Sequence, residues 1–103
     1  MAKLNFTTAP TFALKVAIPV PGKEAVDVEF TFKGRNREEF REYLDASSSK
    51  EDVDALMDTV TGWELENEFG REEVERMTLF YPAAARAIIQ RYITEISGVR
   101  LGN

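Results

Sequence analysis

The stretch from Tyr81 to Ser97, YPAAARAIIQRYITEIS, constrains the fold most because it predicts a long amphipathic helix. Its apolar residues recur at three- and four-residue steps and therefore form one stripe on a 3.6-residue period. These residues are Ala85, Ile88, Ile89, Tyr92, Ile93 and Ile96. Pro82 suits the first helical position, and Gly98 suits the left-handed residue that ends a helix. Burying one large aliphatic side chain is worth roughly 1.5–3 kcal/mol, so the rest of the chain or a second protein must cover the stripe.

Two stretches upstream alternate apolar and polar residues and predict an antiparallel β-hairpin over residues 12–33. The inward face is expected to carry Phe12, Leu14, Val16, Ile18 and Val20 in the first strand and Val26, Val28, Phe30 and Phe32 in the second. Pro19 has no backbone N–H to donate, so the first strand is expected at an edge of the sheet. Two strands alone are barely stable, so their apolar face needs helices or another chain. Self-association through the hairpin edge is therefore one hypothesis.

Three shorter helices are expected between the hairpin and the long helix. The first begins after Asn36, which forms a capping box with Glu39, and the serines at 47–49 end it. Its apolar side carries Phe40, Tyr43 and Leu44. Ser49 is expected to cap the second helix, which Gly62 closes. The apolar stripe of that helix is Val53, Leu56, Met57 and Val60.

The third short helix is predicted to begin after Gly70, with Phe69 and Val74 as a hydrophobic staple. These elements together predict an α+β fold with an N-terminal antiparallel β-hairpin followed by about four helices, the last one longest. A length of 103 residues fits a single domain over residues 1–103. Its expected parts are a flexible lead-in (1–10), the hairpin (12–33), a helical part (36–97) and a tail (98–103).

Composition narrows the function. The chain contains no His and no Cys, which removes the commonest general base, thiol chemistry and disulfides. No apolar run has the length of a membrane span and no signal peptide is evident, so the expected location is the cytoplasm. The net charge of −5 is uneven, because residues 36–75 contain fourteen acidic and four basic residues. An acidic segment argues against nucleic-acid binding; it either faces solvent or attracts a basic protein.

No motif for catalysis or cofactor binding stands out. The acidic residues at 64, 66, 68, 72 and 73 lack the spacing of a calcium loop, so no metal site is predicted. The serines at 47–49 have no His to activate them. Residues 21–24, PGKE, lack the first Gly and the final Ser or Thr of a phosphate-binding loop. We therefore expect no catalytic residue, no metal and no cofactor, and a carboxylate-dependent enzyme remains the last alternative.

Several segments, taken in order, resemble the tail assembly chaperones of long-tailed bacteriophages and prophages. The most specific are Thr61-Gly62-Trp63, the helix start Tyr81-Pro82-Ala83-Ala84 and the ending Gly98-x-Arg100-x-x-Asn103. The resemblance implies a non-enzymatic protein that binds the tape measure protein while the tail is assembled, with the tail tube protein as a second candidate partner. It also implies a location in the bacterial host cytoplasm and absence from the mature virion.

A chaperone of this kind needs an apolar groove with a charged rim, because rim charges govern partner choice more than affinity. We expect the last helix and residues 63–69 to border this groove. The acidic residues between 64 and 75 are expected to form its rim. The predicted partner-binding residues are the apolar Trp63, Leu65, Phe69 and Tyr81 and the acidic Glu64, Glu66 and Glu68. The alternatives are a structural tail protein that stays in the virion and an acidic inhibitor that mimics DNA. A homo-oligomer is possible in each case.

Overall fold

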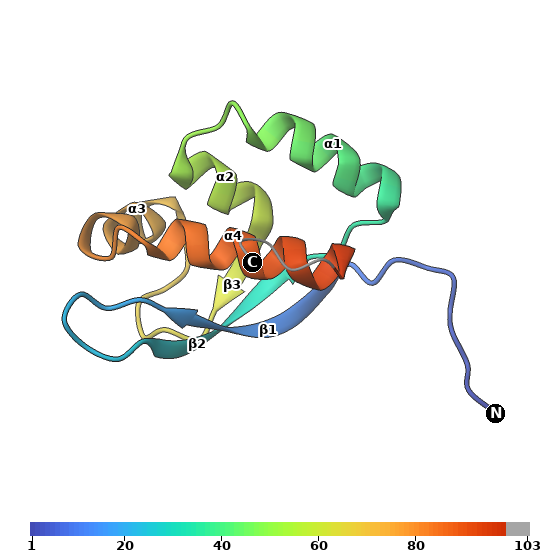
Figure 1. Ribbon diagram of the computed structural model, residues 1–103, viewed down its shortest axis with the longest axis horizontal. Helices are drawn as coiled ribbons and strands as arrows, with labels where there is room; N and C mark the ends of the chain where they lie inside the picture. Colours follow the sequence, from blue (N-terminus) through green and yellow to red (C-terminus); the bar gives the residue numbers. More distant parts are fainter. Residues whose placement is uncertain (99–103) are drawn as a thin grey trace.

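The computed structural model describes residues 1–98 (Figure 1). Its elements follow the order β1 (Thr11–Ile18), β2 (Val26–Lys33), α1 (Arg37–Ser47), α2 (Asp52–Thr59), β3 (Val60–Trp63), α3 (Arg71–Phe80) and α4 (Ala84–Ser97). The predicted α+β fold is confirmed, because an antiparallel hairpin precedes four helices of which the last is the longest. The predicted tail beyond Gly98 lies outside the described residues.

The hairpin forms as its alternating pattern predicts. β1 and β2 pair antiparallel, with Thr11 opposite Lys33 at one end and Ile18 opposite Val26 at the other. The strand order β1-β2-β3 leaves β1 at an edge, as the position of Pro19 predicted. Two expectations for the inward face are wrong: Val20 lies beyond the end of β1, and Val26 is 54% exposed. Both lie at the hairpin end of the sheet.

The sequence did not predict β3, which adds a third strand beside β2. Phe32 pairs with Val60 and Phe30 pairs with Trp63, so the ladder shifts register between them. This irregularity leaves one extra residue on β3, the mark of a β-bulge. Residues three apart on a regular strand point to opposite faces, but here Val60 and Trp63 both lie opposite inward-facing phenylalanines. The bulge therefore turns Trp63 towards the helices.

The existence of β3 corrects the prediction for the preceding helix. α2 ends at Thr59, so Val60 is the first residue of a strand and Gly62 does not close the helix. Ser49 does not cap α2 either, because its hydroxyl donates to the carbonyl of Ala46, and Glu51 takes the N-cap position without a side-chain hydrogen bond. The predicted periodicity extended one residue too far, since Val60 continues the apolar spacing of the helix although its backbone pairs with β2.

The other helix ends agree more closely with their sequence signals. Asn36 and Glu39 form both hydrogen bonds of the predicted capping box, at 2.9 and 2.8 Å. Gly70 is the N-cap residue of α3, and Gly98 ends α4 with φ of 72°, in the left-handed region. The predicted start of the last helix was early by two residues, because Pro82 lies in a turn before Ala84.

All four helices lie on one side of the sheet (Figure 1). The face of the sheet towards them is apolar, whereas Lys15, Asp27 and Glu29 on the other face are exposed. The hydrophobic cluster joins the sheet to α1, α2, α3 and α4, with Tyr92 and Ile88 of α4 fully buried within it. Helices therefore cover the apolar face that motivated the hypothesis of hairpin-edge association, although the edge of β1 remains open.

The lead-in is tied to the sheet beside Gly34. The N–H of Gly34 donates to the carbonyl of Pro10 at 2.9 Å. A Cβ atom at position 34 would lie 1.7 Å from the carbonyl oxygen of Ala9, so only glycine allows this approach. Residues 1–8, which we call the arm, are all exposed and extend away from the rest of the molecule (Figure 1).

Candidate functional site

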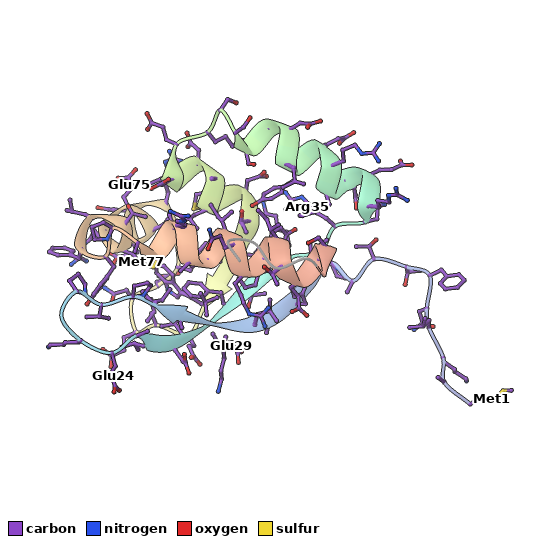
Figure 2. All side chains as sticks on the ribbon, in the orientation of Figure 1. Met1, Glu24, Glu29, Arg35, Glu75 and Met77 are labelled. Carbon is purple, nitrogen blue, oxygen red and sulfur yellow. The ribbon has the colours of Figure 1, made fainter. Side chains whose placement is uncertain are left out.

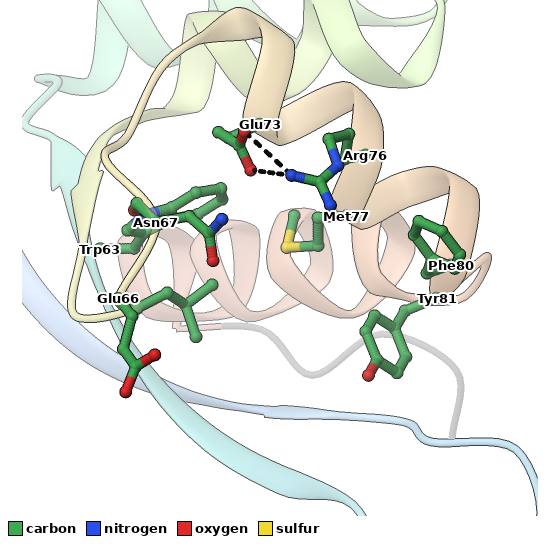
Figure 3. Close-up of a pocket in the computed structure, with 9 residues that line it drawn as sticks. Trp63, Glu66, Asn67, Glu73, Arg76, Met77, Phe80 and Tyr81 are labelled. Carbon is green, nitrogen blue, oxygen red and sulfur yellow. Dashed lines mark hydrogen bonds and ion pairs between the residues drawn. The ribbon is translucent and has the colours of Figure 1, made fainter.

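A groove lies between the segment that follows β3 and the helix α3 (Figure 3). Its volume is about 550 Å³. We call it the α3 groove, and its lining residues are Trp63, Leu65, Glu66, Asn67, Glu73, Arg76, Met77, Phe80 and Tyr81. The side chain of Met77 lies in the middle of the view, with Trp63 on one side and Phe80 and Tyr81 on the other.

Trp63 forms one wall of the groove and is held on several sides. Its indole N–H donates to the carbonyl of Asn67 at 2.7 Å, which closes the chain into a turn after β3. The indole ring meets Phe69 edge-on, with 5.2 Å between ring centroids, and Phe30 edge-on at 6.3 Å. Such aromatic pairs stabilise by about 0.5–1.5 kcal/mol beyond area burial. The wall is therefore built before any partner arrives.

The opposite wall is the C-terminal end of α3. Leu79, Phe80 and Tyr81 are three consecutive large apolar residues, and they are 73%, 64% and 39% exposed. Residues in a helix are separated by about 100°, so three in a row cannot all face the core. Val74 already occupies the buried side of α3, and Met77 is half-buried beside it. The sequence therefore leaves this end of the helix with apolar surface in contact with water.

Charged side chains surround this apolar surface, and several are paired. Arg76 donates to both carboxylate oxygens of Glu73, at 3.1 and 3.2 Å. Outside the lining, at the start of α3, Arg71 donates to Asp54, and this hydrogen bond is the main reason that the pKa of Arg71 is raised above its ordinary value. Within residues 1–98, the side chain of Glu66 has no hydrogen-bond or ion-pair partner. The groove thus combines an apolar floor with a charged rim.

The structure brings together four of the seven predicted partner-binding residues: Trp63, Leu65, Glu66 and Tyr81 all line the groove. Phe69 lies behind Trp63 and supports it. Glu64 turns away, because its carboxylate accepts a hydrogen bond from the backbone N–H of Glu29 at 2.8 Å. Glu68 is exposed and lies outside the lining.

The wall opposite Trp63 comes mainly from α3. The stretch predicted as the last helix, residues 81–97, contributes Tyr81 to the lining, and Tyr81 lies before α4 begins. Among the lining residues, Asn67 lies in the predicted segment 63–69 and Glu73 lies among the acidic residues predicted for the rim, whereas sequence reasoning missed Arg76, Met77 and Phe80. The run of three large apolar residues at 79–81 was the available signal, because one helix face cannot bury all of them.

A polar cluster lies where the end of β2, α1, α2 and the middle of α4 meet. We call it the tyrosine junction, and its members are Arg35, Tyr43, Asp58, Thr59 and Tyr92. Arg35 donates to the hydroxyl of Tyr92 at 3.0 Å and to Asp58 at 3.1 Å, and its guanidinium lies 4.4 Å from the ring centre of Tyr43. Tyr92 in turn donates to the carbonyl of Lys33 at 2.7 Å.

Burial raises the pKa of both tyrosines in the junction above the ordinary value of 10.0. The hydrogen bond of Tyr43 with Thr59 and that of Tyr92 with Arg35 oppose this rise without cancelling it. Both phenols are therefore neutral at physiological pH and act as hydrogen-bonding groups. The junction joins four elements, and its role is to hold the fold together.

Residues 1–98 show no group of three or more acidic side chains that could hold a metal ion. None of the helices in this part of the chain is long and apolar enough to cross a membrane. The α3 groove is the candidate site in the described residues, because it is an open hollow lined by apolar and charged side chains. The fold and this groove together define a small α+β protein with an open, partly apolar groove on its surface.

Comparison with families of known proteins identifies the chain more closely. The whole chain, residues 1–103, matches the model of the phage tail assembly chaperone family. The chain belongs to this family, which supports a chaperone role in tail assembly and suggests that the role is non-enzymatic. Neither the curated proteins nor the solved structures gave a significant match.

Proposed function

We propose that this protein binds the tape measure protein during phage tail assembly and shields its apolar helical segments until the tail tube closes around them. The observation that carries the proposal is the α3 groove, which exposes apolar side chains from two walls in a member of a tail assembly chaperone family. The tail tube protein is a second possible partner. The protein acts in the cytoplasm of the bacterial host and is absent from the mature virion.

The geometry of the groove supports weak and reversible binding of a helix. Apolar residues at one face of an amphipathic helix insert into such a groove at positions i, i+3, i+4 and i+7. Leu65, Met77 and Phe80 supply the apolar contacts, and Glu66 favours partners with basic residues beside the apolar face. A chaperone must release its client, and a groove of about 550 Å³ contacts only a few side chains at a time.

The proposal is tested by pull-down of overlapping tape measure fragments with the full chain. Phe80→Ala should weaken capture about tenfold or more, because truncation of a central aromatic typically has that effect at an interface. Trp63→Ala and Phe69→Ala should also weaken it, provided that circular dichroism shows both variants folded. Leu44→Ala is the matched control, since Leu44 is an exposed apolar residue on α1, outside the groove. Equal capture by all variants would remove the groove from the binding site.

A structural tail protein that remains in the particle is the main competing function. Mass spectrometry of purified virions separates the two, because a chaperone should be absent from finished particles and a structural subunit should be present in defined copy number.

A further inference from the structure

Exposed apolar side chains are concentrated in two places in the described part of the chain. Nine large apolar side chains are exposed among residues 1–98, and seven of them belong either to the arm or to the end of the α3 groove. Those in the arm are Met1, Leu4 and Phe6, and those at the groove are Leu65, Leu79, Phe80 and Tyr81. Exposed apolar patches usually mark interaction surfaces. Two of them on one small protein suggest that one patch binds the other.

The arm has the pattern of an extended ligand. Leu4 and Phe6 are 85% and 96% exposed, and residues two apart on an extended chain point to the same side. Lys3 and Asn5 alternate with them in the sequence, so an extended arm places Lys3 and Asn5 on the opposite side. The arm therefore presents a pair of apolar anchors with a positive charge next to them.

The α3 groove has matching properties. Its volume of about 550 Å³ lies in the range of pockets that enclose small ligands, which leaves room for a few side chains and not for a whole domain. Its floor and walls offer Trp63, Met77 and Phe80 to apolar anchors. Glu66 lines the groove without a partner of its own among residues 1–98, so it is available to a lysine.

The arm is directed away from the groove of its own molecule. Met1 and Met77 lie at opposite ends of the molecule in Figure 2. The close contact between Gly34 and residues 9–10 fixes the point from which the arm leaves the sheet. Phe6 is four residues from Pro10 and so reaches at most about 14 Å from it. A second molecule can bring its groove to the arm more readily than the arm can fold back.

We propose that the arm of one copy binds the α3 groove of a second copy, with Leu4 and Phe6 in contact with Trp63 and α3 and Lys3 beside Glu66. The contact covers the exposed apolar side chains of the arm in one molecule and of the groove in the other while no client is present. It predicts that a client competes with the arm for the same groove. The proposal does not depend on the identity of the client, because its test uses this protein alone.

The first test is sedimentation equilibrium of the full chain over a wide range of concentrations. The wild-type protein should self-associate. The double variant Leu4→Ser/Phe6→Ser should associate at least about tenfold more weakly. Phe80→Ser should have a similar effect from the groove side. All three residues are exposed, so the variants should fold. Val26→Ser is the matched control, because Val26 is 54% exposed at the hairpin end, and it should associate like the wild type.

A mixing experiment tests whether the contact joins arm to groove. Leu4→Ser/Phe6→Ser retains an intact groove and Phe80→Ser retains an intact arm, so an equimolar mixture should form pairs that neither variant forms alone. Trp63 is the only tryptophan and lines the groove, so it reports on occupancy directly. Its emission should shift to shorter wavelength as the wild-type concentration rises and should stay constant in the arm variant.

Three results would overturn the proposal. The first is a wild-type chain that stays monomeric at the highest concentration. The second is an arm variant that self-associates as strongly as the wild type, which would indicate pairing through the β1 edge or through two grooves. The third is a mixture of the two variants that stays monomeric.

Discussion

The tyrosine junction and the α3 groove differ in the burial of their aromatic residues. At the tyrosine junction, Tyr92 is fully buried and its hydroxyl has both a donor and an acceptor as partners. At the α3 groove, just before α4 begins, Phe80 and Tyr81 are 64% and 39% exposed. Both regions are rich in aromatic and charged residues. The difference is that the junction completes its contacts within the chain, whereas the groove does not.

The comparison separates residues that stabilise the fold from residues that remain available to a partner. In the described residues, no buried side-chain polar atom lacks a hydrogen-bond partner, and the junction is the largest part of that network. An unpaired buried polar group costs about 1–3 kcal/mol, so a complete network favours one arrangement of the elements. Exposed apolar groups on α3 contribute little to that arrangement and are free to contact another polypeptide.

The largest expected effect comes from removing the central ring of the junction. Tyr92→Ala should lower the free energy of unfolding by about 3–5 kcal/mol, because the ring is fully buried against Phe32 and Tyr43. This loss is a large part of the stability of a small protein, so a substantial unfolded fraction is expected. Urea denaturation followed by circular dichroism measures the change. A loss below about 1 kcal/mol would mean that the junction does not organise the fold.

Removing only the hydroxyl sharpens the comparison. Tyr92→Phe keeps the ring but leaves the carbonyl of Lys33 without this donor, so it should cost about 1–3 kcal/mol. Tyr81→Phe is the matched substitution at the groove, and it should change stability by less than about 0.5 kcal/mol because Tyr81 is exposed. Both values come from urea denaturation at neutral pH. Equal effects at the two positions would contradict the contrast between the two regions.

The junction also predicts a loss of stability at high pH. Burial raises the pKa of Tyr43 and Tyr92 in the folded protein above the ordinary 10.0, so the unfolded chain ionises first. Their contribution is therefore complete below about pH 10 and is lost as the pH rises through the folded values. The slope is at most about 1.4 kcal/mol per pH unit for each tyrosine. Unfolding measured from neutral to alkaline pH should show a flatter profile for Tyr43→Phe/Tyr92→Phe than for the wild type.

The smallest expected effect on stability is at the groove. Phe80→Ala should change the free energy of unfolding by less than about 0.5 kcal/mol, because the side chain is 64% exposed. The melting curve of this variant should overlay that of the wild type, even though its capture of tape measure fragments falls. A clearly destabilised Phe80→Ala would place this residue with the core instead of the interaction surface.

The sequence alone determined the elements that depend on near neighbours. Alternation predicted β1 and β2, the pair Asn36 and Glu39 predicted the start of α1, and Gly98 predicted the end of α4. These signals are local because a cap or a strand face is defined within a few residues. The order of segments also indicated the family, which the match over residues 1–103 confirms.

The sequence predicted a smaller part of the candidate site than of the fold. It selected Trp63, Leu65, Glu66 and Tyr81, because an isolated Trp among acidic residues and an aromatic helix end are visible in one dimension. It missed Met77 and Phe80 as the facing wall, since which helix lies across from residues 63–67 depends on packing far along the chain.

Only the tertiary structure decided β3, the α3 groove and the tyrosine junction. β3 needs a bulge that pairs Trp63 with Phe30, and the junction needs Arg35 to meet Tyr92, residues 57 positions apart. Such contacts depend on the packing of α4 over the sheet, because a hydrogen bond between distant residues forms only when the core has brought their elements together. Local periodicity carries no information about that packing. The helix predicted from it therefore included Val60, although the backbone of Val60 pairs with β2 as part of β3.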